Sequence, residues 1–440
     1  MIVGFDRFWG KTRPNPFSPT FGGRPSELVG RDYQIEQICA GLASGPSDPK
    51  YLSILLGSRG TGKTALLNEI GELAEKNGWI LVRIPSPHGG LAQLLDSAIG
   101  DAINKYENLD SASAESVSTE RTLSVNLGAI KGQWSKRRTA DSPTTFSTSL
   151  RNLAEIVQAA GTSALLHIDE LHAIDRQEAR VFFSELQYVT NVDKQPVAFL
   201  GACLPEAKTT LLADEKNTFL QRCIKYNLPA LNNADALRGL RVPIHSAGGN
   251  IEIEPLKAAA QAVNGSPYRL QMIGYNAWAI AGAPETIIDM DTVNLAIAEA
   301  DKQTEDNISL PSWYDLSTRD RELLQYVAES GGISSIEHLA KSYRVLPKDL
   351  SDQIRRLEVS EHIHVENGTV SLTGRTIPAE LISKLANKLG TASTSNPLEP
   401  HETHRYLDPA KNPNRCNNWM PLAKAKCVLR TGHSGRCRSK

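Results

Sequence analysis

The sequence lacks long apolar runs, and this absence excludes a membrane-spanning protein. No stretch of its 440 residues approaches the roughly 18 consecutive apolar residues of a transmembrane helix. Residues 1–7 also lack the basic and then apolar pattern of a secretory signal peptide. We therefore expect a cytoplasmic protein that makes no contact with a membrane.

Net charge is almost absent as well, because 48 Lys and Arg residues balance 49 Asp and Glu residues, which leaves −1. A balanced chain has no overall field that attracts a nucleic acid, so any nucleic-acid surface must be local. The hydrophobic and charged fractions, 40% and 22%, are ordinary for a soluble globular protein. The length is sufficient for about two to four domains.

Cysteine is scarce, and the six cysteines fall into two groups. Three lie in separate apolar segments and are expected to be buried thiols: Cys39, Cys203 and Cys223. The others crowd the C-terminal end in the pattern Cys416-x10-Cys427-x5-His433-x3-Cys437. In a reducing compartment this clustering favours a tetrahedral Zn²⁺ site over disulfides. Three free thiols and an incidental histidine are the alternative.

The most specific pattern is a glycine-rich segment that fits G-x-x-x-x-G-K-[ST]: Gly57, Ser58, Arg59, Gly60, Thr61, Gly62, Lys63 and Thr64. An apolar run at 51–56 predicts a buried strand before it, and 65–70 predicts a helix after it. Backbone N–H groups of such a loop close around phosphates at a helix N-terminus. We expect Lys63 to reach the β- and γ-phosphates and Thr64 to ligate Mg²⁺. A plain glycine-rich turn is the alternative.

A second nucleotide motif follows further along the chain. Residues 164–168 predict an apolar strand that ends in Asp169 and Glu170. In a parallel sheet this strand would deliver the acidic pair to the carboxyl edge. Asp169 is expected to hold Mg²⁺ through water and Glu170 to polarise the attacking water, with an acidic helix N-cap as the alternative. His167 and His172 miss the zinc-protease spacings, so we treat them as structural.

The alternation of strand-like and helix-like segments predicts an α/β domain with a parallel sheet over residues 25–230. Residues 1–24 are expected to be an arm that lies on this domain. Residues 107–145 read as an insertion, whose predicted hairpin and basic cluster suit either a nucleic-acid contact or a solvated loop. The helical pattern of residues 231–308 predicts a second, lid-like domain.

Residues 309–388 predict a winged helix-turn-helix, with three helices followed by two strands around the turn Asn367-Gly368. Several side chains on or before its last helix are placed to contact DNA: Lys341, Arg344, Lys348, Ser351 and Arg355. Nearby acidic residues dilute this charge, so both DNA binding and protein docking stay open. Residues 389–412 read as a linker, and 413–440 as a basic, zinc-binding tail.

Together these motifs resemble the AAA+ ATPases, in the branch of initiator-like (origin-recognition-type) and STAND-like ATPases, over roughly residues 25–385. The resemblance implies that the Val29-Gly30-Arg31 turn lies near the adenine of ATP. It also implies that Arg222 reaches the neighbouring subunit's site, where it would stabilise γ-phosphate charge. Hydrolysis would then require a homo-oligomer. A surface arginine paired with a carboxylate is the alternative for Arg222.

Two positions depart from the family pattern. The family often places a phosphate-sensing Arg directly after Gly-x-Pro, whereas this chain has Tyr268 there and Arg269 next to it, so the sensor is displaced or absent. The predicted fourth strand ends in Gly201, Ala202 and Cys203, where the family usually offers Asn, Thr or Ser to position water. ATP binding with slow, switch-like turnover follows from these departures.

Two functions remain open at this point. In the first, ATP with Mg²⁺ drives assembly of a switch whose winged helix, hairpin and zinc tail engage double-stranded DNA. In the second, a STAND-like signalling or defence regulator, nucleotide state releases the winged helix to dock a protein partner.

Overall fold

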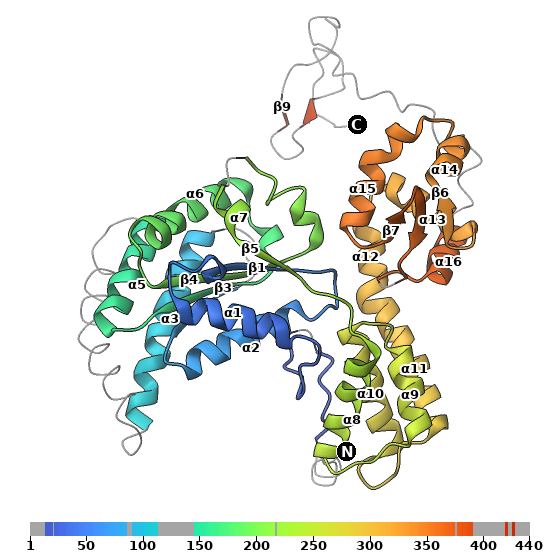
Figure 1. The fold of residues 1–440 in the computed structure, drawn as a ribbon, viewed down its shortest axis with the longest axis horizontal. Helices are drawn as coiled ribbons and strands as arrows, with labels where there is room; N and C mark the ends of the chain where they lie inside the picture. Colours follow the sequence, from blue (N-terminus) through green and yellow to red (C-terminus); the bar gives the residue numbers. More distant parts are fainter. Residues whose placement is uncertain are drawn as a thin grey trace, which may run out of the picture.

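The computed structural model describes residues 14–20, 22–85, 90–112, 145–215, 218–374 and 376–389, and the segments 419–420 and 425–426. An α/β part, coloured blue to green in Figure 1, lies beside a column formed by a helical part and an orange C-terminal part. Most of the predicted insertion, the linker, and all four predicted zinc ligands fall outside the described residues.

The α/β part is built on five strands in the order β2-β3-β4-β1-β5. Every neighbouring pair is parallel, which confirms the predicted fold class. The strands are β1 (Leu52–Leu56), β2 (Ile80–Ile84), β3 (Ala164–Ile168), β4 (Val197–Cys203) and β5 (Ile224–Asn227). Because helices cover both faces of a parallel sheet, its strands read as continuous apolar runs, as they do here.

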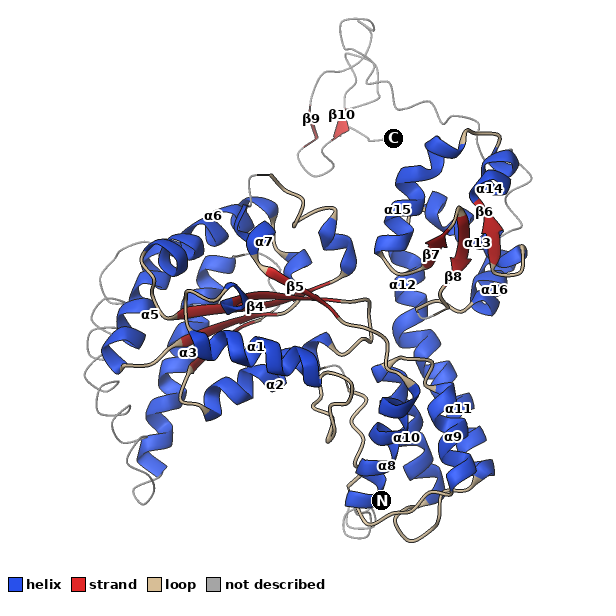
Figure 2. Ribbon diagram, in the orientation of Figure 1, coloured by secondary structure: helices blue, strands red, loops and turns tan. Residues whose placement is uncertain are grey.

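Residues of β1, β2, β3 and β4 alternate between two different cores. Leu55 and Leu165 face a core with helices α1 (Asp32–Ser44) and α2 (Lys63–Lys76). Leu56 and Leu166 face a larger core on the other side. That core is completed by α3 (Leu91–Ala112), α5 (Phe146–Ala160), α6 (Arg176–Gln187) and α7 (Thr218–Arg222). Figure 2 shows α1 and α2 on one side of the red strands and α5 and α6 on the other.

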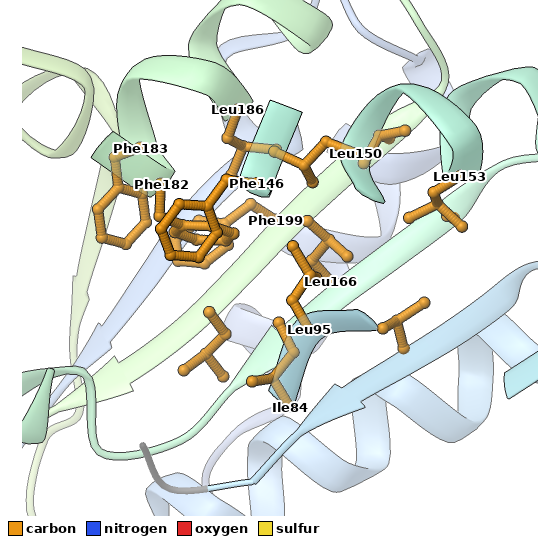
Figure 3. Close-up of a cluster of buried hydrophobic side chains, with 14 of the residues drawn as sticks. Ile84, Leu95, Phe146, Leu150, Leu153, Leu166, Phe182, Phe183, Leu186 and Phe199 are labelled. Carbon is orange, nitrogen blue, oxygen red and sulfur yellow. The ribbon is translucent and has the colours of Figure 1, made fainter. Parts of the chain in front are cut away.

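Aromatic rings fill the centre of the larger core (Figure 3). Phe183 lies edge-on to Phe182 and to Phe199, with ring centroids 4.9 and 5.4 Å away. It also stacks on Phe219 at 5.5 Å. Such pairs stabilise a core beyond the area that they bury, so α6 and α7 are held firmly against β4.

The helical part has a core of its own. Its helices are α8 (Asn233–Ser246), α9 (Ile253–Ala262), α10 (Pro267–Ala281) and α11 (Met290–Thr304). Phe17, which is 3% exposed, belongs to this core. The N-terminal arm was expected to lie on the α/β domain. Its residues 14–20 pack on α10 of the helical part, where the Phe17 ring is buried, whereas Arg24 pairs with Glu69 and Glu72 of α2.

The C-terminal part combines helices with the antiparallel sheet β6-β8-β7. Its helices are α12 (Leu310–Asp315), α13 (Thr318–Glu329), α14 (Ile336–Tyr343), α15 (Ser351–Val359) and α16 (Ala379–Leu389). Its strands are β6 (Ile333–Ser335), β7 (Ile363–Glu366) and β8 (Thr369–Leu372). The β7-β8 hairpin turns at the predicted Asn367-Gly368, where both residues have positive φ.

Short elements complete the chain. The 3-10 turns are Pro49–Tyr51, Leu171–Ala173, Pro205–Lys208 and Pro347–Leu350, and Tyr188–Val192 and Glu305–Ser309 form π-helical turns. The last helix predicted for the winged helix-turn-helix therefore divides into the 3-10 turn Pro347–Leu350 and α15. The segments β9 (Trp419–Met420) and β10 (Ala425–Lys426) pair with each other. No helix in the described part of the chain has the length and apolar character needed to cross a bilayer.

Replacing Phe183 with Ala is expected to lower the free energy of unfolding by about 3–5 kcal/mol, because the cavity would lie among three other aromatic rings. Val181→Ala on the same helix is the control, since this valine is 49% exposed. Urea denaturation of both variants measures the difference. Equal midpoints would show that the aromatic cluster does not stabilise the α/β part.

Candidate nucleotide site

The phosphate-binding loop runs from β1 into the first turn of α2, which begins at Lys63. Gly60 and Gly62 adopt φ angles of 79° and 83°, a left-handed conformation that favours glycine. The loop thereby wraps around the N-terminus of α2, where backbone N–H groups and the helix dipole favour an anion.

Lys63 lies inside this loop. Its Nζ donates hydrogen bonds to the carbonyl oxygens of Gly57 at 2.7 Å and Ser58 at 2.8 Å. Burial lowers the pKa of the Lys63 ammonium, and the nearby Asp169 carboxylate opposes that shift. The Lys63 side chain is therefore held beside the backbone of the loop, and its contact with the β- and γ-phosphates stays a prediction.

The two nucleotide motifs meet across the sheet. Thr64 Oγ1 donates a hydrogen bond of 2.6 Å to Asp169 Oδ2, although the two residues are 105 positions apart. The second oxygen, Asp169 Oδ1, accepts from the backbone N–H of Glu170 at 2.8 Å. A hydroxyl and a carboxylate oxygen at this distance are the hard oxygen ligands that Mg²⁺ takes beside phosphates. These residues therefore fit Mg²⁺, which would neutralise charge on the β- and γ-phosphates.

Glu170 occupies a strained turn directly after β3. Its φ is 51°, in the left-handed region that non-glycine residues rarely adopt. Such conformations cost of order 1–3 kcal/mol and cluster at functional sites. The carboxylate lies close enough to His172 to raise the pKa of that imidazole, although burial dominates and lowers it.

The two histidines around the acidic pair differ in their surroundings. His167 is buried in β3, and burial lowers its pKa to about 4, which suits the structural role predicted from the sequence. His172 lines a cavity beside the loop. Its Nδ1, like that of His167, is buried with no hydrogen-bond partner among the described residues. The spacing of the histidines in the sequence did not predict that His172 lines a cavity.

A cavity of about 140 Å³ opens beside the loop. Loop residues Gly60–Thr64 and the preceding turn, including Val29 and Arg31, line it together with residues of α10. Arg31 is only 1% exposed and donates hydrogen bonds to the carbonyl oxygens of Thr61 at 3.0 Å and Gly30 at 2.8 Å. Burial lowers its pKa to about 10. Val29 thus lines the cavity with an apolar side chain, and Arg31 stabilises the loop through its hydrogen bond to Thr61.

Arg269 does not line this cavity. Its Nη1 lies 2.5 Å from Asp301 Oδ1, and its Nε donates to the carbonyl oxygen of Ala262. The preceding residue, Tyr268, lines the cavity and donates its backbone N–H to the Gly60 carbonyl oxygen at 3.2 Å. Asp301 therefore holds the Arg269 guanidinium within the helical part in this structure. Arg269 as a displaced phosphate sensor stays a prediction.

The carboxyl end of β4 offers no amide or hydroxyl side chain to hold a water molecule. Gly201, Ala202 and Cys203 are all buried, and burial raises the pKa of the Cys203 thiol to about 12. Cys223 is also buried, whereas Cys39 is only half-buried. Arg222 lies at the end of α7, where it is exposed, and no hydrogen bond or ion pair of its side chain occurs among the described residues.

A contact that the sequence did not reveal joins the loop to the C-terminal part. Arg59 Nη2 lies 2.8 Å from Asp315 Oδ2 at the end of α12. A second cavity, of about 320 Å³, lies beside this ion pair. Ser58, Arg59, His172 and Glu206 line one side, and Asp320, Arg356 and His362 line the other. The phosphate loop is therefore in direct contact with the C-terminal part.

The five residues predicted to contact DNA are all exposed: Lys341, Arg344, Lys348, Ser351 and Arg355. Arg355 lies 3.8 Å from Asp352, which offsets part of its charge. No group of three or more His, Cys, Asp or Glu side chains suited to a metal occurs among the described residues. The predicted zinc ligands lie outside those residues, so the zinc site stays a prediction.

Comparison with known proteins gives one matching family model and several solved structures with a similar fold. Residues 27–200 match the model of the AAA ATPase domain. The ORC2 protein of Aeropyrum pernix, solved in ADPNP-ADP complexes, aligns with a TM-score of 0.55 and 15% identity over 85% of this chain and 98% of that chain. The Walker-type ATPase PABY2304 of Pyrococcus abyssi gives 0.54 and 14% over 84% and 98%. No curated protein matches the chain in sequence.

The family match spans the β1 loop, the acidic pair after β3 and most of β4, but not α10, which also lines the cavity. The solved structures share too little sequence to show more than the fold, and that fold extends over most of both chains. The expected resemblance is confirmed at the level of this domain: residues 27–200 match the AAA ATPase domain, and the chain carries an ATPase domain of that kind.

Proposed function

We propose that this ATPase is a slow switch in which the nucleotide controls the contact between the phosphate loop and the C-terminal part. The ion pair between Arg59 and Asp315 carries the proposal, because Arg59 belongs to the loop that receives the phosphates. A γ-phosphate would bring negative charge close to this guanidinium. The ion pair between Arg59 and Asp315 would then be weaker with ATP bound than with ADP bound.

The strength of this pair suits a switch. The side chains of Arg59 and Asp315 are 37% and 62% exposed. An ion pair in water contributes about 0–1 kcal/mol, so a phosphate charge nearby is sufficient to shift its balance. His172 and Glu206 line the adjoining cavity. A change of charge at Asp169 or Glu170 would therefore also change the electrostatic potential in that cavity. The contact is weak enough to reverse with each round of hydrolysis.

Catalysis would depend on three groups of the chain. Lys63 holds the phosphates against the loop, Thr64 and Asp169 hold Mg²⁺, and Glu170 removes the proton of the attacking water. The apolar end of β4 leaves that water without a second hydrogen-bonding residue, which favours slow turnover. Arg222, exposed at the end of α7, supports completion of the site by a neighbouring copy in a homo-oligomer.

The output of the switch would be a DNA contact. The order of helices α13, α14 and α15 and the β7-β8 hairpin supports a winged helix-turn-helix. The exposed basic residues around α15 supply a local positive surface of the kind that binds phosphates.

One observation favours a protein partner instead. The basic surface around α15 is mixed with acidic groups, since Asp352 lies 3.8 Å from Arg355 and offsets part of its charge. A surface of mixed charge attracts phosphates less strongly than a purely basic one. Duplex binding by the full chain at low salt, weakening as salt rises, would support DNA; no binding at low salt would leave the signalling alternative.

Glu170→Gln is expected to keep ATP affinity while hydrolysis falls at least about 100-fold, because the amide cannot accept the proton of the water. Glu285→Gln, at an exposed position of the helical part, is the control. Phosphate release measures turnover, and titration with a fluorescent ATP analogue measures affinity. Unchanged turnover would remove Glu170 from the mechanism.

Asp315→Asn is expected to raise amide hydrogen exchange in α12 and α15 by up to about fivefold without nucleotide, because it removes a pair worth at most about 1 kcal/mol. In the wild type, ATP with Mg²⁺ should raise exchange in the same helices. Asp352→Asn removes a pair that lies within α15 and serves as the control. Exchange that is the same with ATP, with ADP and without nucleotide would contradict the switch.

For the tail, we expect about one zinc ion per chain when the protein is prepared with zinc present. Cys427→Ser and Cys437→Ser should each lose the metal, whereas Cys39→Ser should retain it. Elemental analysis of the purified proteins gives the stoichiometry. A wild-type preparation that stays metal-free would refute the zinc site.

A further inference from the structure

The second cavity lies where the α/β part meets the C-terminal part. Its volume of about 320 Å³ falls in the range of roughly 300–1,000 Å³ that is usual for small-molecule sites. The 3-10 turn Pro205–Lys208, which follows β4, packs against α15 at this cavity. Among the described residues, none lines both this cavity and the one beside α10, so the two are separate sites.

Three buried polar atoms on the lining have no hydrogen-bond partner among the described residues: Ser312 Oγ, Thr376 Oγ1 and His172 Nδ1. Ser312 is only 7% exposed and Thr376 only 4%. The three side chains come from α12, from the segment before α16 and from the 3-10 turn after β3. A buried polar group costs free energy unless a neighbour, water or a ligand satisfies it. The cavity therefore offers hydrogen bonds to a bound molecule.

The charged groups on the lining already neutralise one another. Arg59 lies 2.8 Å from Asp315, and the Arg356 guanidinium lies 3.0 Å from the Asp320 carboxylate. Both histidines on the lining are neutral near pH 7, because burial lowers the pKa of each, that of His362 to about 4. Among the described lining residues, a phosphate or a carboxylate would meet no unpaired cation, so an anionic ligand is disfavoured.

Apolar side chains from both parts form much of the remaining lining. They are Leu204 and Ala207 of the α/β part and Leu316, Leu357 and Val359 of the C-terminal part. Such walls suit the apolar faces of a heterocycle better than a sugar, whose many hydroxyls would each need a partner. Glu206 adds a carboxylate that can accept a hydrogen bond from an amino group.

We propose that the second cavity binds an uncharged nucleoside whose base carries an amino group. The base would lie between the apolar walls and donate its amino group to Glu206, while the hydroxyls of Ser312 and Thr376 bind the remaining polar atoms. Because this ligand would contact both parts, it would hold the C-terminal part against the phosphate loop. The proposal does not require that ATP weakens the ion pair between Arg59 and Asp315.

Equilibrium dialysis of the full chain with labelled adenosine, guanosine and cytidine tests the proposal. ADP and Mg²⁺ are kept at saturating concentration, so that the nucleotide site is filled. We expect about one nucleoside per chain for at least one of the three probes. Ser312→Ala and Thr376→Val should each weaken that binding about fivefold, because each removes one hydrogen bond, and should leave the affinity for ADP unchanged.

Ser334→Ala is the matched control. Ser334 belongs to the same C-terminal part, is also 7% exposed and has an Oγ without a partner among the described residues, but it does not line the cavity. It should leave nucleoside binding unchanged.

No binding of any of the three nucleosides would overturn the proposal. So would binding that more ADP displaces, that Ser312→Ala and Thr376→Val leave unchanged, or that Ser334→Ala weakens equally. Failure of the wild type to bind ADP would instead refute the nucleotide site. The two cavity variants would still decide whether a nucleoside binds in the second cavity.

Discussion

The rest of the structure depends on where the parallel sheet places the ends of β1 and β3. These two strands flank β4, so their carboxyl ends bring Thr64 and Asp169 within 2.6 Å of each other at one edge. The two cores fix that arrangement, because α2 packs on one face of the sheet and the aromatic cluster of α6 and α7 packs on the other. Displacement of either layer would separate the hydroxyl from the carboxylate and with it the Mg²⁺ site.

The nucleotide site contacts the helical part and the C-terminal part through two interactions of different strength. The N-terminal residues that line the cavity reach the helical part through the buried ring of Phe17, which makes a firm contact. The C-terminal part reaches the loop through an exposed ion pair, which responds to a single charge. Firm packing on one side and a weak electrostatic contact on the other would allow the C-terminal part to move while the nucleotide stays bound.

The sequence predicted the sheet, the loop and the acidic pair because each is a local pattern with a fixed geometric consequence. It did not predict β6, whose three residues carry no apolar alternation and follow two glycines. Nor could it predict that Asp301 holds Arg269 away from the cavity, that Asp315 meets Arg59, or that Phe17 is buried on α10. Those contacts join segments far apart in the chain, and only the packing of whole helices brings them together. The apolar spacing of Leu381, Ile382 and Leu385 is typical of a helix, and α16 lies outside the helices predicted from the sequence.

The central claim is that ATP binding at the loop changes the state of the whole protein. Light scattering of the wild type and of Arg222→Ala, with and without ATP and Mg²⁺, tests it most directly. The account predicts a larger assembly for the wild type with ATP, and a smaller species for the wild type without ATP and for Arg222→Ala in either condition. A mass that is the same in all four samples would contradict it.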